Sequence, residues 1–299
     1  MWRSDRLSER VDISNDLAPD GTLRRAALPA LPVLLVLVGI YLLSGYAQPG
    51  FLSGFNRTYI FYPVLWSCLA LLVAVVSWKG APGRVVYTRR LLWAALLVGA
   101  FQVACLAIAG LFTSFARSPY NHTLYYLFLN TCFFGSSLVG MEFARSYLLN
   151  SFPGQRAEIM VVPVTLVFAI LSLPLARLTG GDILSLTFLA GTCLPLLARS
   201  LVASYLALVT RGPLASIAYL GILLAFQWYS PILPDLSWIV NAFFGTLAAV
   251  IGLLILQNLH ETSMASPTDT EEETKEKRSS LTGWVITGVV CVAIVFVSF

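Results

Sequence analysis

Residues 281–299 read LTGWVITGVVCVAIVFVSF, a run of 19 residues without a charged side chain. As an α-helix this run would extend for about 28 Å, close to the thickness of the hydrocarbon core of a bilayer. The run therefore predicts a membrane-spanning helix. On the topology derived below, this helix runs outward, so any residue following Phe299 would stand on the outer face.

Eight further apolar runs precede it. None alternates polar and apolar residues, as the strands of a membrane barrel would, so each predicts a helix. The seventh is the shortest, and a re-entrant helix is the alternative there. We expect an all-α protein, a polytopic membrane helix bundle of about eight spans with a separate C-terminal anchor helix. The eight runs are 27–46, 59–78, 91–112, 124–148, 159–176, 184–209, 214–230 and 238–259.

The overall composition supports the same class. Hydrophobic residues make up 58 % of the chain and charged residues 11 %, whereas a soluble domain carries about 25 % charged residues. The lipid bilayer is therefore the expected partner. Basic stripes, RNA-binding aromatic motifs and zinc spacings are all missing, so no nucleic-acid partner is expected.

Four segments follow from these patterns. Residues 1–26 form a polar N-terminus with mixed charge, and 27–259 form the multi-span membrane domain. Residues 260–280, HETSMASPTDTEEETKEKRSS, are charged and nearly free of large apolar side chains. Such a segment cannot bury a core and predicts a disordered linker. Residues 281–299 are the anchor helix.

The distribution of basic residues predicts the orientation of the chain. With a cytoplasmic N-terminus and alternating sides, 16 of the 19 Lys and Arg residues fall on the inner side. Only Arg57, Arg117 and Arg177 fall outside. The positive-inside rule then predicts a multi-pass protein of the plasma membrane, with a cytoplasmic N-terminus and an outside C-terminus.

One group of ionisable residues lies within the expected spans. Glu142 is the only acidic residue there, Arg145 follows one helical turn later, and Arg199 lies deep in the sixth run, four residues after Pro195. Charged groups in lipid are costly, which makes these three a candidate intramembrane site. An ion or substrate site is one interpretation. The alternatives are snorkelling to the membrane surface, a local pair, or a Glu142–Arg199 pair between helices.

No arrangement for catalysis or metal binding is evident. The five cysteines lie in apolar runs without CxxC spacing, and they are expected to pack as small apolar residues. His122 and His260 fall on opposite sides of the membrane. No phosphate loop, HExxH motif or catalytic pair of carboxylates is present. We therefore expect no cofactor, no metal and no catalytic residue within 1–299.

Two segments carry a family resemblance. The C-terminal stretch RSSLTGWVITGVVCVAIVFVSF (278–299) resembles the anchor helix of signal peptidases of the endoplasmic-reticulum and archaeal type. The stretch RGPLASIAYLGILLAFQWYSPILPDLSW (211–238) looks like part of the multi-span region found before that helix in some bacterial members. The predicted outward emergence of the last helix agrees with the side on which these peptidases act.

The resemblance implies the membrane region of a serine endopeptidase that removes signal peptides from exported precursor proteins. In that family the nucleophilic Ser, its basic partner and its acidic residue follow the anchor helix. None matches a position here, so the resemblance implies that this chain cannot cleave a substrate alone and that a truncated gene is one explanation. The alternatives are a carrier of small solutes or ions, and a non-enzymatic sensor or assembly factor that docks through 260–280.

Overall fold

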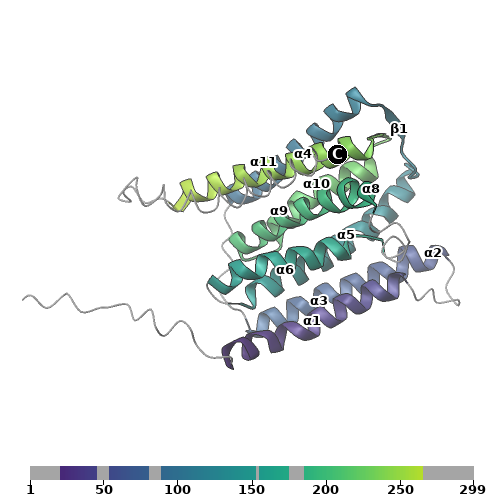
Figure 1. Ribbon diagram of the computed structural model, residues 1–299. Helices are drawn as coiled ribbons and strands as arrows, with labels where there is room; N and C mark the ends of the chain where they lie inside the picture. Colours follow the sequence, from purple (N-terminus) through teal and green to yellow (C-terminus); the bar gives the residue numbers. More distant parts are fainter. Residues whose placement is uncertain (1–20, 46–53, 81–88, 153–154, 175–184, 265–299) are drawn as a thin grey trace, which may run out of the picture.

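The computed structural model describes residues 21–45, 54–80, 89–152, 155–174 and 185–264 (Figure 1). The expected anchor helix 281–299 and most of the expected N-terminal and linker segments lie outside the described residues. The helices nevertheless extend into both of these expected segments. Helix α1 (Gly21–Gly45) starts within the expected polar N-terminus, and α11 (Trp238–Met264) continues past His260, the expected start of the linker.

Each of the eight apolar runs up to residue 259 contains a helix within its described residues. Five helical segments are long and apolar enough to cross a membrane: Gly54–Ser77, Arg89–Phe112, Leu124–Asn150, Leu189–Thr210 and Trp238–His260. These segments indicate a multi-pass membrane protein. The seventh run is the unbroken helix α10 (Leu214–Tyr229). The remaining helices are α2 (Gly54–Asn56), α3 (Tyr62–Gly80), α4 (Arg89–Phe112), α5 (Leu124–Asn150), α6 (Gln155–Leu171), α8 (Leu186–Phe188) and α9 (Leu194–Thr210).

Two of the long segments contain a π-helical turn that ends two residues before a proline. The turn η2 (Arg57–Phe61) precedes Pro63, and η3 (Leu189–Cys193) precedes Pro195. Proline lacks an N–H and its ring collides with the carbonyl four residues earlier. A wider turn relieves that collision without ending the helix. Pro195 thus leaves a continuous helical segment from Leu186 to Thr210.

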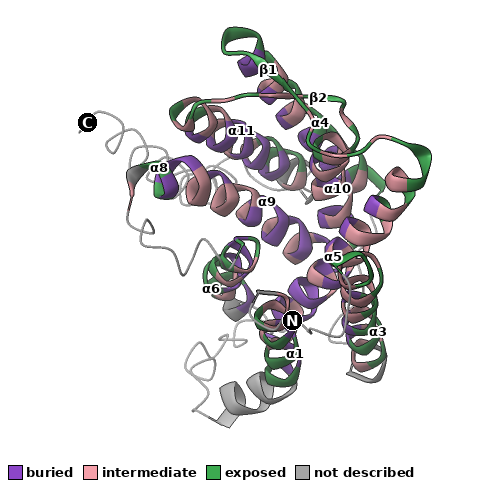
Figure 2. Cartoon of the chain, turned by 90° about the vertical axis from the view of Figure 1, so that its right-hand side faces the viewer, coloured by how far each residue is buried: buried purple, intermediate pink, exposed green. Residues whose placement is uncertain are grey.

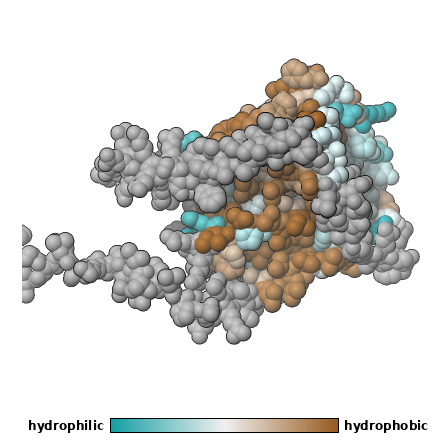
Figure 3. Space-filling model, in the orientation of Figure 1, coloured by the Kyte–Doolittle hydropathy of each residue, from teal (hydrophilic) through white to brown (hydrophobic). Residues whose placement is uncertain are grey.

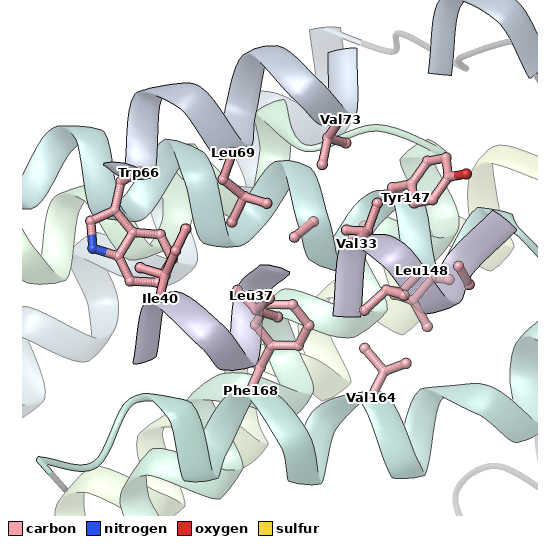
Figure 4. Close-up of a cluster of buried hydrophobic side chains, with 14 residues drawn as sticks. Val33, Leu37, Ile40, Trp66, Leu69, Val73, Tyr147, Leu148, Val164 and Phe168 are labelled. Carbon is pink, nitrogen blue, oxygen red and sulfur yellow. The ribbon is translucent and has the colours of Figure 1, made fainter. Parts of the chain in front are cut away.

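The helices pack around two apolar cores. The first joins α1, α3, α5 and α6, with Leu37, Leu69 and Phe168 among its fully buried side chains (Figure 4). The second joins α4, α9, α10 and α11. Helix α9 contacts α5 and α6 as well as α10 and α11, so it lies between the two halves (Figure 2).

The outward faces of the helices are apolar too. On α4, Leu97 is 67 % exposed whereas the next residue, Val98, is 2 % exposed. Brown, hydrophobic side chains fill the middle of the described part of the face shown in Figure 3, and hydrophilic residues lie toward its ends. Lipid solvates such surfaces as well as a protein core does.

A short sheet was not foreseen by the all-α expectation. Strand β1 (Phe115–Arg117) follows α4, and β2 (Ile232–Pro234) follows α10; the two pair antiparallel, with Ala116 opposite Leu233. The apolar runs exclude a membrane barrel for the spans only, so short strands can still pair in the loops between them. Since paired strands must share one side of the membrane, the sheet agrees with the predicted alternation, which places both loops outside.

Candidate functional site

Glu142 and Arg145 lie on one face of α5 because they are three residues apart. An oxygen of the Glu142 carboxylate and the Arg145 Nη2 are 3.1 Å apart, and the side chains are 1 % and 2 % exposed. Snorkelling is therefore wrong for both residues, which remain inside the bundle. The local pair is the arrangement that forms.

Arg145 also binds α9 and α6. Its Nη1 donates to the Ser200 carbonyl oxygen at 2.7 Å and to the hydroxyls of Ser200 and Ser204 at 3.0 Å each. Its guanidinium lies 4.5 Å from the centre of the Phe168 ring. The Ser200 hydroxyl in turn donates to the Thr165 carbonyl at 3.0 Å. One charged side chain thus links three helices across the boundary between the two apolar cores.

Some polar atoms in this group have no partner. The second carboxylate oxygen of Glu142, Nε of Arg145 and the hydroxyl of Thr165 are buried without a hydrogen bond. Buried polar groups are normally paired. Unsatisfied atoms at one place inside a membrane bundle therefore mark a position where a water or a ligand can bind.

Arg199 does not join the Glu142–Arg145 pair. Among the described residues no ion pair connects Arg199 to Glu142, so the expected pair between helices does not form; the carboxylate is already engaged within α5. Arg199 lies within electrostatic range of the Tyr219 hydroxyl of α10, and its Nε is buried without a hydrogen-bond partner. Among the described residues, Glu142 and Arg145 thus form an ion pair, and Arg199 stands outside it.

A second polar group lies in the other half of the bundle. The buried hydroxyl of Tyr219 donates to Oε1 of Gln102 at 2.6 Å, and Nε2 of Gln102 donates to the carbonyl of Gly245 at 3.1 Å. These bonds join α10, α4 and α11. The hydroxyl of Tyr219 lies within electrostatic range of both Arg145 and Arg199, so the two polar groups are neighbours.

Sequence reasoning missed Gln102 and Tyr219. Gln102 had an available signal, because it is the only amide or charged side chain in the run 91–112. Tyr219 had none, since tyrosine occurs widely in membrane helices and at membrane interfaces. Its burial is decided by the packing of α10 against α4 and α9.

Aromatic side chains gather at the end of the bundle that carries the sheet. Tyr120 stacks on Trp228 with ring centres 3.9 Å apart, and Phe133 and Phe134 also contact Trp228. Nε2 of His122 lies 3.0 Å from the carbonyl oxygen of Ser230. These contacts hold the loop before α5 against the end of α10.

Among the described residues, the serines that contact Arg145 have no general base beside them in this site. Ser200 and Ser204 contact an arginine, which cannot act as a base towards a hydroxyl. In the described part of the chain, no group of three or more His, Cys, Asp or Glu residues is placed to hold a metal ion. The four cysteines described there are free thiols.

Comparisons with protein-family models, with curated proteins and with solved structures find no match to this chain. The resemblance to signal peptidases therefore has only the two quoted segments and the topology in its support.

Proposed function

We propose that the bundle is the membrane-embedded region of a signal-peptidase-like serine endopeptidase of the plasma membrane, which removes signal peptides from exported precursors. The observation that carries the proposal is the pairing of β1 with β2, which brings two loops to one face. The basic residues of the chain favour the outside for that face. The segment 211–238, which carries half of the resemblance, forms α10 and β2 and leads into α11.

In this proposal the bundle anchors and positions a catalytic region, and that region follows residue 299. Under the same proposal the N-terminus lies in the cytoplasm and α11 returns the chain to that side. The segment 281–299, which lies outside the described residues, is expected from its sequence to cross outward again. Such an order would hold a catalytic region beside the β1–β2 face. Signal peptides, which are apolar helices, would then meet the lipid-exposed helices of the bundle.

Site-specific photocrosslinking tests this role with the chain as it exists. A photoreactive residue at Ile232, which is 55 % exposed on β2, should crosslink to a precursor that carries a signal peptide. The same precursor without its signal peptide should not react. Arg211, exposed after α9 at the end of the bundle opposite the sheet, provides a control position. Equal crosslinking with and without the signal peptide would contradict the proposal.

Reading the coding DNA past codon 299 tests the enzymatic part. A continuing frame with a Ser-Met nucleophile motif would support a peptidase, and a Ser→Ala variant of it should then leave precursors uncleaved. A stop codon directly after Phe299 would remove the support for peptidase activity.

A carrier of small solutes or ions is the second candidate. It is favoured by one observation, the unpartnered polar atoms of Glu142, Arg145 and Arg199 inside the bundle. Polar sites near the midplane are typical of transporters. Uptake by proteoliposomes containing the purified chain, compared with empty liposomes, tests this candidate.

A further inference from the structure

Arg199 lies in the middle of a membrane-length segment. The helical segment Leu189–Thr210 has 22 residues, and Arg199 is near its centre. Either end of the segment is therefore about 15 Å away along the helix axis. This distance is too long for the side chain to reach a lipid headgroup at the membrane surface, so Arg199 must be stabilised within the bundle.

Among the described residues, none forms an ion pair with Arg199. Glu142 is the one acidic residue in the apolar runs, and its partner is Arg145. No hydrogen bond or ion pair of Arg199 is found with any described residue, and its Nε is buried. Within the described part of the bundle, two guanidinium groups and one carboxylate leave one positive charge without an ion-pair partner, an arrangement that is costly unless a counter-charge is present.

The neighbouring polar side chain is neutral. Tyr219, which lies within electrostatic range of Arg199, is fully buried and donates a hydrogen bond to Gln102. Its oxygen retains lone pairs but provides no negative charge. The Nε atoms of Arg145 and Arg199 are both buried without a hydrogen-bond partner. Each Nε carries a hydrogen and is a hydrogen-bond donor. Donors and an excess positive charge attract an anion and repel a cation.

We propose that Arg199 binds a small monovalent anion, either chloride or the carboxylate group of an organic acid, between α9 and α10. The guanidinium presents several donors in a planar fork that matches a carboxylate and also holds a halide. Arg199 is only partly buried, so its guanidinium is not fully enclosed by side chains. The site involves bundle residues alone and stands apart from the peptidase-type proposal.

Equilibrium dialysis of the purified full chain in detergent tests the site. Radiolabelled chloride and radiolabelled acetate serve as separate probes, with ionic strength kept constant by a bulky sulfonate. The wild-type chain should bind about one anion per molecule. Arg199→Gln should weaken binding by about tenfold or more, because a hydrogen bond to a charged group is lost. Arg117→Gln, at an exposed position on β1, should bind as the wild type does.

A second measurement guards against misfolding of the variant. In buffer without small anions, Arg199→Gln should unfold at a higher temperature than the wild type, because the uncompensated charge is removed. Saturating chloride or acetate should raise the unfolding temperature of the wild type but not that of the variant. Binding of chloride alone or of acetate alone supports the site and identifies its anion. Absence of saturable binding in the wild type, or equal binding by Arg199→Gln, would overturn the proposal.

Discussion

The carboxylate of Glu142 and the guanidinium of Arg145 approach to 3.1 Å within one helix, and both side chains are almost completely buried. The remaining bonds of Arg145 extend to Ser200 and Ser204 on α9. The pair therefore has two consequences. It neutralises a charge inside the bundle, and it fixes how α5 and α9 pack against each other.

Replacing Glu142 with Gln should destabilise the bundle strongly, since Arg145 would then be a buried charge without its partner. Breaking a buried pair in this way typically costs about 3 kcal/mol or more. Denaturant unfolding of the variants in detergent, arranged as double-mutant cycles, measures the coupling. Glu142 should be coupled to Arg145 and show little coupling to Arg199. A larger coupling to Arg199 would contradict the structure.

Tyr219→Phe should destabilise the bundle moderately, because Oε1 of Gln102 would remain buried without a donor. Hydrogen bonds between membrane helices contribute about 0.6 kcal/mol on average, so we expect a loss of about 1 kcal/mol. Tyr125→Phe is the control, since Tyr125 is 60 % exposed. Adding Gln102→Leu to Tyr219→Phe should restore part of the loss; additive losses would show that the two side chains do not interact.

Gly140→Ala should separate α3 from α5. A Cβ at Gly140 would lie 2.7 Å from the carbonyl oxygen of Trp66, a backbone atom that cannot move aside alone. Gly135 of the same helix is the matched control, because a Cβ there meets nothing within 4 Å. Gly135→Ala should be neutral or stabilising by up to about 1 kcal/mol, since alanine favours helix more than glycine does. Equal effects of the two variants on thermal stability would contradict the close approach.

Cysteines at Ala116 and Leu233 should form a disulfide under mild oxidation. The two residues are direct partners in the antiparallel β1–β2 register, where Cβ atoms lie about 5 Å apart. The native cysteines would first be replaced by Ala. Gel mobility reports the crosslink. A cysteine at Ala116 combined with one at Ser151, at the opposite end of α5, should remain reduced.

The sides of the membrane can be tested in the same cysteine-free background. In intact cells, a membrane-impermeant maleimide should label a cysteine at Ala116, in β1, and should not label one at Arg89, at the start of α4. Cell lysis should expose Arg89→Cys to the reagent. The reverse pattern would invert the orientation that the basic residues predict.

The site was predicted from the sequence in part. Glu142 and Arg145 could be identified as neighbours, because three residues along a helix bring two side chains to one face. Arg199 lies one residue before Ser200 on α9 but does not join the Glu142–Arg145 pair. This outcome depends on which face of α9 meets α5. Apolar residues on every face of these helices conceal that choice, because lipid and protein interior select the same side chains.

The sequence by itself determined the class, a helical protein of the membrane, because a bilayer demands about 20 apolar residues for every crossing. Of the eight spans expected up to residue 259, five are helices long and apolar enough to cross a membrane. It also indicated the sides of the loops through the basic residues. The tertiary structure alone decided which helices touch, that Glu142 pairs within α5, and that Tyr219 meets Gln102 across the bundle. These contacts depend on packing and on a few hydrogen bonds between residues distant in sequence, and hydropathy contains no information about either.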